Sequence, residues 1–315
     1  MHPSVSILVL NYNGLAHLDD CLRSLLRAAS AYAGPCAVVC VDNRSTDGSR
    51  AFVRERYRSV EVIEAPANDF LFSLNAVVAA REEEIVIVVN NDMRFDENFV
   101  GPLAAHFANP EVFAAGAAIF DWAGASHTVG PRCARLRQFW FHKWWRCDRQ
   151  QTALTLEACG GAAAYRRPMF VELGGFDPLF RPGYYEDLDL SYRAWGRGWS
   201  VVYEPRSRAY HRESASMLAR FGDTAKARLL YRNHLLFTVK NIGGAAFLAG
   251  FFLCLPYRVL SPLLRGYQVP LRGFLQALPK LPLALRKRLA RVDPPPDLSR
   301  FEQVTPLAVP PVARA

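Results

Sequence analysis

The sequence lacks the glycine-rich turns with which many nucleotide-binding proteins hold phosphate groups. No GxGxxG follows the first apolar run, where Asn11-Tyr12-Asn13-Gly14 contains a single glycine. This argues against a dinucleotide-binding oxidoreductase, although Asp42 at the end of the second apolar run mimics the acid that holds a ribose. No GxxxxGK(S/T) occurs either, and Asn11–Leu18 contains no Lys or Arg to grip a triphosphate. Phosphates must then be neutralised in another way, most simply by a divalent metal.

Two further absences concern the cellular compartment. The seven cysteines are odd in number and show no CxxC spacing, which argues against a zinc site and a complete disulfide framework. The N-terminus shows no basic segment with a long apolar stretch after it, because the run Val5–Leu10 already ends at Asn11. The sequence therefore predicts a reduced, cytoplasmic protein.

Acidic residues are missing between Asp223 and Asp293, whereas the same segment contains twelve Lys and Arg residues. The chain of 315 residues has a formal net charge of +9, so the remainder carries −3. The basic character belongs to one C-terminal segment. It points to an anionic membrane surface as partner, and away from nucleic acid.

Long apolar runs are also scarce. The longest charge-free one, Ile242–Tyr257, has sixteen residues and is interrupted by three glycines and Pro256. A perpendicular membrane span needs roughly twenty residues. We therefore expect a helix that lies in the membrane plane or re-enters it, flanked by cations that meet the headgroups. A marginal span, and a buried helix of the core or of an oligomer, are the alternatives.

The first hundred residues alternate between strand and helix patterns. Helical spacing of leucines follows the first strand, and the other helices are expected to end near Arg56 and to cover Ser73–Ala80. The expected strands are Val5–Leu10, Ala37–Val41, Val60–Glu64 and Ile85–Val89. Continuous apolar strands of this kind predict an α/β domain with a mostly parallel sheet covered on both faces.

Polar residues follow three of these strands, as Asn11-Tyr12-Asn13, Asp42-Asn43 and Asn90-Asn91-Asp92. Ligands of such sheets bind at the carboxyl ends of the strands. Asn90 and Asp92 could provide oxygen ligands to a hard cation such as Mg²⁺. A plain polar turn is the other interpretation of the same residues.

The ordered set of motifs resembles glycosyltransferase family 2, in particular the rhamnosyltransferase-like enzymes of surface polysaccharides. No single block is decisive, but their order and spacing fit that family over roughly residues 4–215. The matching segments are VSILVLNYNG (5–14), VDNRSTDGS (41–49), VVNNDM (88–93), LGGFDPLF (173–180), YYEDLDLSYRAWGRGW (184–199) and His211. The resemblance implies a GT-A fold, a mixed and mostly parallel sheet flanked by helices, and transfer of a sugar from a nucleotide sugar to an acceptor.

The resemblance also implies where the nucleotide sugar binds. Asp42 is similar to the family's acid that contacts the base or ribose, with Asn11, Asn13 and Asn43 nearby. Asn75 aligns with a polar residue of the loop beside the nucleotide.

Two further features of the donor site depart from a simple match. Phe70 replaces a glycine that many members have in the loop before Asn75, so the identity of the donor cannot be transferred from relatives. Gly160 and Gly161 belong to a run of small residues where the family places the sugar or acceptor, and a tightly packed strand or turn explains them equally well.

The metal motif of the family is similar to Asn90-Asn91-Asp92, with Asn90 in place of the first Asp. Asp92 is then the implied metal ligand, and Asn90 and Asn91 remain able to bind the nucleotide sugar. His211 resembles a histidine that completes metal or diphosphate coordination. The implied cofactor is Mg²⁺ or Mn²⁺. Because Asn90 replaces the first Asp, the motif offers this ion one carboxylate fewer than the family's motif does.

The pair Glu186-Asp187 is implied to carry the chemistry. Asp187 resembles the base that takes the proton of the acceptor hydroxyl, and Glu186 an acceptor-orienting neighbour. Together with Asp189, three acids crowd a helix start. Mutual repulsion raises their proton affinity and the helix N-terminus lowers it, so the sequence leaves the net pKa open. The apolar stripe Leu188, Tyr192 and Trp195 on this helix is expected to pack in the core.

Arg132–Arg149 interleaves cations with aromatic residues. Such a segment suits contact with a sugar acceptor, a lipid diphosphate or a membrane interface, and also plain packing. Single-stranded nucleic acid is the least favoured partner.

These observations lead to one hypothesis: a metal-dependent, inverting glycosyltransferase that acts on a lipid-linked or membrane-presented glycan on the inner face of the cell membrane. A nucleotide-sugar-forming nucleotidyltransferase and a non-catalytic membrane adaptor are the alternatives. A processive synthase is disfavoured because no QxxRW occurs.

The chain is predicted to divide into three parts. They are a catalytic domain over residues 1–222, a basic helical membrane-associating segment over 223–292, and a Pro-rich, disordered tail over 293–315. Deleting everything after Asp223 should then weaken membrane association more than donor binding.

Overall fold

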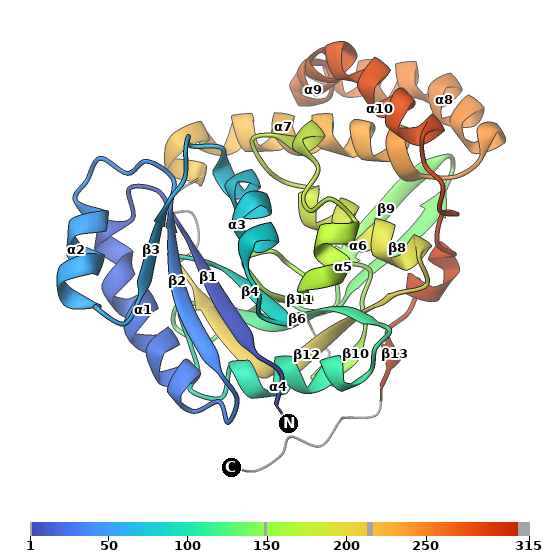
Figure 1. Ribbon diagram of the computed structural model, residues 1–315. Helices are drawn as coiled ribbons and strands as arrows, with labels where there is room; N and C mark the ends of the chain where they lie inside the picture. Colours follow the sequence, from blue (N-terminus) through green and yellow to red (C-terminus); the bar gives the residue numbers. More distant parts are fainter. Residues whose placement is uncertain (1, 148–149, 213–216, 308–315) are drawn as a thin grey trace.

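The computed structural model describes residues 2–147, 150–212 and 217–307. Its centre is a mixed sheet with the strand order β13-β10-β12-β6-β11-β4-β1-β2-β3, to which β5 and β7 are added at β12 and β6 (Figure 1). The strands are β1 (Val5–Asn11), β2 (Cys36–Asp42), β3 (Glu61–Glu64), β4 (Ile85–Asn90), β5 (Met93–Phe95), β6 (Val112–Asp121), β7 (His127–Val129), β10 (Ala153–Leu154), β11 (Ala162–Arg166), β12 (Ser200–His211) and β13 (Thr305–Pro306).

The pairing around β1 is parallel, as expected. β1 lies between β2 and β4 and is parallel to both, and β2 is parallel to β3. β11 runs in the opposite direction between β4 and β6, while β12 is parallel to β6. The predicted α/β class and the mixed, mostly parallel sheet are confirmed.

Helices cover both faces of this sheet. The helices of the body are α1 (Leu15–Ser30), α2 (Ser49–Arg56), α3 (Leu74–Ala80), α4 (Val100–Ala105), α5 (Arg167–Glu172) and α6 (Glu186–Gly196), with short 3-10 turns η1 (Phe70–Ser73), η2 (His106–Ala108) and η3 (Pro178–Phe180).

Alternation along the strands explains how both faces become buried. In β4, Ile85, Ile87 and Val89 belong to the core under α1, α2 and α4, whereas Val86 and Val88 belong to the core under α3, α5 and α6. Because successive side chains of a strand point to opposite faces, a continuous apolar strand feeds two cores at once. The stripe Leu188, Tyr192 and Trp195 is buried in the second core, as predicted.

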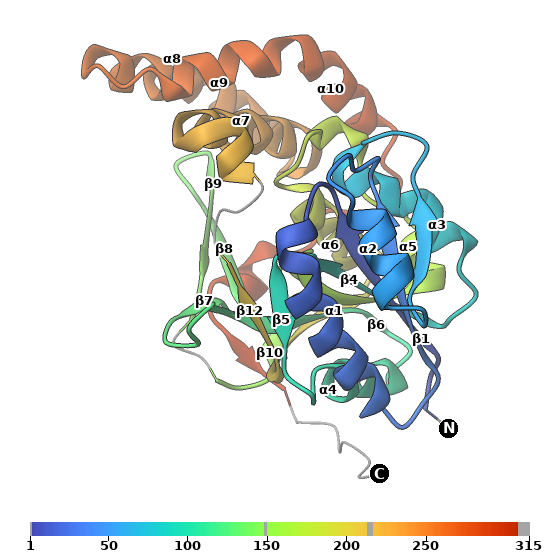
Figure 2. The same ribbon diagram turned by 90° about the vertical axis from the view of Figure 1, so that its left-hand side faces the viewer.

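Four further helices follow β12. They are α7 (Met217–Asn241), α8 (Ala245–Leu264), α9 (Val269–Ala277) and α10 (Leu281–Leu289), with η4 (Leu278–Lys280) between the last two. α9 and α10 pack against α7, and α8 packs against α9. Figures 1 and 2 show α8, α9 and α10 as a layer above α7. The strands β1, β2 and β4 run toward α7, so their carboxyl ends face this helical layer (Figure 1).

The boundary predicted at residues 222 and 223 falls inside α7. Leu235, Leu236 and Phe237 of this helix are buried in the same core as α6, and Lys240 is buried with them. α7 is therefore part of the body. The extension, a layer of α8, α9 and α10, follows it and contributes Phe251, Leu255, Val259, Ala277 and Ala284 to the same core.

The tail predicted to be disordered is folded over residues 293–307. The 3-10 turn η5 (Leu298–Phe301) buries Phe301, whose ring lies 5.0 Å from that of Trp195, and β13 pairs with β10. The sequence pattern predicted disorder because the segment is rich in proline. Burial of Leu298 and Phe301 and the ion pair between Asp293 and Arg197 hold it on the body. Residues 308–315 lie outside the described residues.

A separate hairpin connects the body with the extension. β8 (Arg132–Arg137) and β9 (Trp140–Trp145) pair antiparallel, and Figure 2 shows them rising beside the sheet toward α7. At the tip of the hairpin, the main-chain carbonyl of Gln138 accepts a hydrogen bond from Arg258 of α8. Trp140 stacks on His234 of α7 and on Phe251 of α8. Packing thus accounts for part of the aromatic segment, whereas Arg135 and Arg137 are exposed.

Candidate active site

The three polar strand ends meet at one edge of the sheet. Asn11 lies opposite Asp42, and Leu10 lies opposite Asn90. Nδ2 of Asn11 donates to Oδ1 of Asp42 at 2.9 Å, and Oδ1 of Asn11 accepts from Nδ2 of Asn91 at 2.6 Å. The predicted convergence of these side chains is therefore present, with Asn11 as the bridge.

Gly14 is required by this arrangement. A Cβ at position 14 would lie 1.9 Å from Nδ2 of Asn91 and 2.6 Å from Oδ1 of Asn11. No side chain fits there. The single glycine of the first turn thus leaves room for the amide network.

Asp42 is fully buried, with 0% of its surface exposed. Its second oxygen accepts a hydrogen bond from the main-chain N–H of Ser45 at 2.9 Å. The same oxygen lies 3.6 Å from Nε of Arg50. Asp42 therefore organises the loop after β2, and a carboxylate with one hydrogen bond on each oxygen can still accept another.

Asn13 joins the loops after β1 and β2. Its Oδ1 accepts from the main-chain N–H of Thr46 at 2.8 Å, and its own N–H donates to Oγ of Ser45 at 2.9 Å. Ser45 was not singled out from the sequence. It lies in the loop after β2, and its hydroxyl accepts hydrogen bonds from Asn11 and Asn13 only because the loops after β1 and β2 lie together in the fold.

Asn43 faces the loop before α3. Its Nδ2 donates to the carbonyl of Phe70 at 2.6 Å, and its buried Oδ1 accepts no hydrogen bond within the described residues. Phe70 has φ +53°, a left-handed conformation that glycine adopts without cost. A buried free acceptor beside a strained loop marks this as a position where a ligand donor group would fit.

Asn75 is placed differently from the expectation. Its Nδ2 donates to the carbonyl of Phe176, and its Oδ1 accepts from the N–H of the same residue, both at 2.9 Å. The side chain holds the Gly174-Gly175-Phe176 loop on α3. In this structure both ends of the Asn75 amide bond to the main chain of Phe176, so that neither is available to a nucleotide sugar.

Asp92 and His211 are brought together by the pairing of β5 with β12, in which Met93 lies opposite His211. Oδ1 of Asp92 is buried and lies 3.2 Å from Nε2 of His211, without the alignment of a hydrogen bond. Two ligands at right angles and about 2.1 Å from a cation are roughly 3 Å apart, so the pair fits a shared metal ion.

This pair is incomplete as a metal site. Among the described residues no group of three His, Cys, Asp or Glu side chains could hold a metal. Mg²⁺ and Mn²⁺ commonly take their other ligands from phosphate and water, so two protein ligands suit a metal that binds together with a nucleotide diphosphate.

Glu186 and Asp187 begin α6 directly after Tyr184 and Tyr185, which have φ values of +67° and +75°. Asn233 of α7 holds this strained turn by donating to the carbonyls of Gly183 and Tyr184 at 2.8 and 2.7 Å. The conformation of the turn is therefore imposed by α7.

Asp187 is held by main-chain donors. Its Oδ2 accepts from the N–H of Gly160 at 3.1 Å, and its Oδ1 from the N–H of Leu188 at 2.8 Å. Burial, with the nearby charge of Glu157, raises the pKa of Asp187 to about 6 despite these bonds. Burial and the charge of Asp187 raise the pKa of Glu186 well above its ordinary value, which favours its neutral form.

The two glycines link the carboxylates to the metal motif. Gly160 donates to Asp187, and the carbonyl of Gly161 accepts from the N–H of Asn90 at 3.1 Å. A Cβ at Gly161 would lie 3.2 Å from Nδ2 of Asn90. Both glycines therefore lie between the predicted donor residues and the predicted base.

Asp189, the third acid of the trio, belongs to a different site. It is 0% exposed and bonds to Arg193, Lys240 and Asn241. Lys240 also binds Asp177 at 2.6 Å. These contacts clamp α7 to α6 and to the loop after α5.

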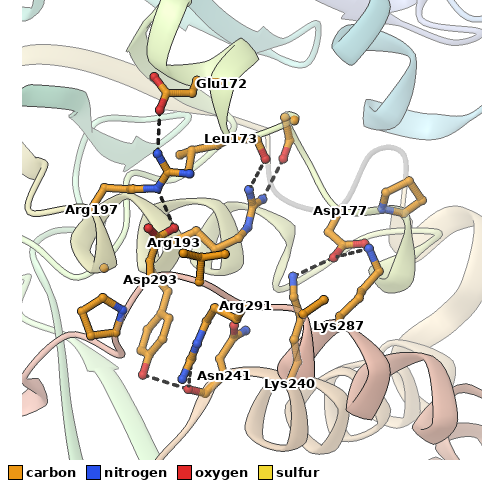
Figure 3. A pocket seen from close by; sticks show the side chains of 18 residues that line it. Glu172, Leu173, Asp177, Arg193, Arg197, Lys240, Asn241, Lys287, Arg291 and Asp293 are labelled. Atoms are coloured by element: carbon orange, nitrogen blue, oxygen red, sulfur yellow. Dashed lines mark hydrogen bonds and ion pairs between the residues drawn. The ribbon is translucent and has the colours of Figure 1, made fainter.

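A hollow of about 440 Å³ lies next to this clamp, between α6 and the end of α10 (Figure 3). None of the residues predicted to bind donor, metal or acceptor lines it. Several of its cations already have carboxylate partners, for example Lys287 with Asp177 and Arg197 with Glu172 and Asp293 (Figure 3), and Arg291 donates to the carbonyl of Asn241. The hollow is therefore separate from the strand ends and from Asp187.

Similar solved structures identify the fold. The mannosyltransferase PcManGT from Pyrobaculum calidifontis, in complex with GDP-Man and Mn²⁺, is 17% identical, with a TM-score of 0.55 over 92% of this chain and 88% of the other. GalNAc-T7, with UDP, GalNAc and Mn²⁺, is 16% identical, with a TM-score of 0.54 over 85% of this chain. This chain covers only 58% of GalNAc-T7. The fold is that of the GT-A glycosyltransferases.

The sequence then defines the family. The chain belongs to glycosyl transferase family 2, whose profile matches residues 6–174. A relative named N-acetylglucosaminyl-diphospho-decaprenol L-rhamnosyltransferase, from two strains of Mycobacterium tuberculosis, is 27% identical over 244 residues, which are 69% of this chain and 78% of the relative. The protein is a glycosyltransferase, so the nucleotidyltransferase and the non-catalytic adaptor lose their support.

Proposed function

We propose that this glycosyltransferase transfers a sugar from a nucleotide-diphosphate donor, with inversion, to a hydroxyl group of a lipid-linked glycan acceptor in cell-surface polysaccharide synthesis. The position of Asp187 carries the proposal. This carboxylate is held by Gly160 next to Asn90, and burial raises its pKa to about 6. The relative named for rhamnosyl transfer to N-acetylglucosaminyl-diphospho-decaprenol supports a deoxyhexose as donor sugar and a lipid-linked diphosphate as acceptor.

The donor binds across the strand ends in this proposal. Asn11, Asn13, Asp42 and Asn43 form the nucleotide side, while Asn90, Asn91, Gly160 and Gly161 lie toward the sugar. Asp92 and His211 would hold Mg²⁺ or Mn²⁺, which supplies positive charge for the leaving diphosphate. The observation in favour of this ion is that the buried Oδ1 of Asp92 accepts no hydrogen bond within the described residues, although Nε2 of His211 lies 3.2 Å away.

Asp187 acts as the general base of a single displacement. The acceptor oxygen forms a bond to the anomeric carbon as the bond to the diphosphate breaks, and the hydroxyl proton passes to Asp187. A base with a pKa of about 6 is ionised at neutral pH and yet holds a proton better than an ordinary aspartate. Glu186 in its neutral form would donate a hydrogen bond that orients the acceptor.

Donor and metal binding can be tested by thermal unfolding of the wild type with UDP-, GDP- and dTDP-sugars, with and without Mn²⁺. A donor at a hundred times its Kd stabilises the folded state by about 2.7 kcal/mol and raises Tm by roughly 5 °C. We expect Asp92→Asn and His211→Ala to abolish the part of this rise that depends on Mn²⁺. The exposed Glu97→Gln serves as control. The donor-binding proposal fails if no nucleotide sugar shifts Tm under either condition.

The helix α8 is the proposed site of contact with a membrane. Leu253 and Leu264 are 82% and 88% exposed, while only Phe251, Leu255 and Val259 of this helix are buried. The cations Arg265, Arg272 and Arg286 around it are exposed. We propose that α8 lies in the plane of an anionic bilayer on the cytoplasmic side, although by length and composition it is also apolar enough to cross one.

Only part of the basic segment is available to lipid headgroups. Lys240 is buried against Asp177 and Asp189, and Arg288 donates to the carbonyls of Val239 and Ile242. Some of the positive charges counted in the sequence are thus bound to groups inside the protein and cannot contact a membrane.

Membrane contact through α8 predicts a selective loss in the double variant Leu253→Ser/Leu264→Ser. Burying each leucine contributes about 1.5–3 kcal/mol, so we expect at least a ten-fold weaker partition onto phosphatidylglycerol vesicles, measured by sedimentation. Val171→Ser, an exposed apolar residue of α5, is the matched control. Unchanged sedimentation of the double variant would remove α8 from the membrane contact.

A further inference from the structure

Glu157 is a buried carboxylate close to the proposed base, and the reaction described above gives it no role. It is the only charged residue between Gln150 and Tyr165, and it is 4% exposed. Its Oε1 accepts from Nε and Nη2 of Arg132 at 3.0 and 2.7 Å. Its Oε2 is buried and accepts no hydrogen bond within the described residues. Leaving a carboxylate oxygen buried without a partner costs free energy, so the fold retains this group against a penalty.

Lys143 is a partly buried cation of the hairpin near the same carboxylates. It lies on β9, on the same face of the hairpin as the buried Phe141. Its Nζ lies 3.9 Å from the ring centroid of Tyr185, the residue directly before Glu186 and Asp187. Burial lowers the pKa of Lys143, while the charges of Glu157, Asp187 and Glu186 oppose that shift.

The two charges act on Asp187 in opposite directions. Glu157 is second only to burial in raising the pKa of Asp187, and Lys143 lowers it together with the N–H groups of Gly160 and Leu188. Both charges act on Glu186 with the same signs. The contacts place both charges beside the catalytic pair. The residue after Glu157 donates its N–H to Ser191 of α6, Gly160 donates to Asp187, and Lys143 lies over the ring of Tyr185.

We propose that Glu157 and Lys143 are positioning residues that balance the charge around Asp187, so that it is ionised at neutral pH and still accepts the acceptor's proton. The inference rests on the proposed role of Asp187 as base. Neither residue needs to touch the substrate. Arg132 contributes indirectly, because its two hydrogen bonds to Oε1 fix the orientation of Glu157.

Other titratable groups around the cluster do not change charge near neutral pH. Burial raises the pKa of Cys159 to about 12 and that of Tyr165 well above its usual value. Burial, with the charge of Lys143, lowers the pKa of His234 on α7 to about 3. Among the groups packed around Asp187, the acidic limb of the rate profile should therefore report the coupled carboxylates. His211 of the proposed metal pair is unchanged in variants of Glu157 and Lys143, so the difference between these variants and the wild type carries the test.

The test is the pH dependence of kcat/KM. For the wild type we expect activity to fall as the pH drops through about 6, because Asp187 is then protonated. Glu157→Gln removes a negative charge and should move this limb to lower pH, while Lys143→Met should move it to higher pH, each by roughly 0.5 to 1 unit. The variants Glu157→Asp and Lys143→Arg keep the charges, and we expect them to keep the limb near that of the wild type.

Damage to the fold cannot imitate this result, because it lowers kcat/KM at every pH and does not shift the limb in opposite directions. Limbs that stay in place, or move the same way in both variants, would overturn the inference. If Asp187→Asn is inactive in the same assay, that outcome leaves the base assignment intact. If Asp187→Asn is fully active, the proposed function fails instead.

Discussion

Replacing Asp187 by asparagine is expected to lower kcat by about 10² to 10⁴-fold, the range that a positioned general base contributes. Asparagine has nearly the same shape, and its single oxygen can still accept from one of the two N–H groups, of Gly160 or Leu188, that bind the carboxylate. What is lost is the ability to take the hydroxyl proton during the attack. Initial rates of sugar transfer to a defined acceptor at pH 7.5 or above measure this effect.

The controls for Asp187→Asn separate chemistry from binding and folding. The Tm of the variant and its rise with donor should match those of the wild type, because Asp187 faces the acceptor side in the proposal. Glu186→Gln should retain more activity, since a neutral side chain at that position can still donate a hydrogen bond. Transfer by Asp187→Asn at the wild-type rate would show that another group is the base.

Truncation after residue 222 is expected to prevent folding of the catalytic domain, in contrast to the expectation from sequence that it would mainly reduce membrane association. It removes Leu235, Leu236, Phe237, Val239 and Ile242, all buried in the core. Each such side chain contributes about 1.5–3 kcal/mol, and the sum is comparable to a net stability of about 5–15 kcal/mol. We expect insoluble protein, or soluble protein without a cooperative unfolding transition.

The loss of α7 also removes specific support from the catalytic turn. Asn233 holds the carbonyls of Gly183 and Tyr184, and Lys240 pairs with the buried Asp177 and Asp189. Removing one partner of a buried ion pair costs about 3–5 kcal/mol. The control is the full-length double variant Leu253→Ser/Leu264→Ser, which should fold and bind donor. A truncated protein that unfolds cooperatively and binds donor would restore the boundary drawn from the sequence.

The edge of the sheet that carries the site could be predicted because its determinants are local. The strand ending at Asn90 has only apolar residues before it, and parallel strands bring their carboxyl ends together, so Asn11, Asp42 and Asn90 had to meet. The sequence could not show that Asn75 faces Phe176, because that contact joins residues about a hundred positions apart.

The charges of the C-terminal segment were harder to interpret for a related reason. Lys240 and Arg288 look like surface cations in a segment without acids, yet their partners are carboxylates and carbonyls of distant elements. The buried leucines of α7 are close in sequence to these cations. The helix therefore lacks the separation into an apolar and a charged face by which a core helix is recognised. Glu157 gave one signal that could have been used: it is a lone charge in an apolar segment next to two glycines.

The direction of the strands relative to the helical layer sets the side from which an acceptor would arrive. The carboxyl ends of β1, β2 and β4 face α7, and α8 to α10 lie beyond it (Figure 1). If α8 rests on the bilayer as proposed, the strand ends that carry the site are turned toward the lipid, with the helical layer between them. An acceptor anchored in the same bilayer would then reach the site from the side on which the strands end.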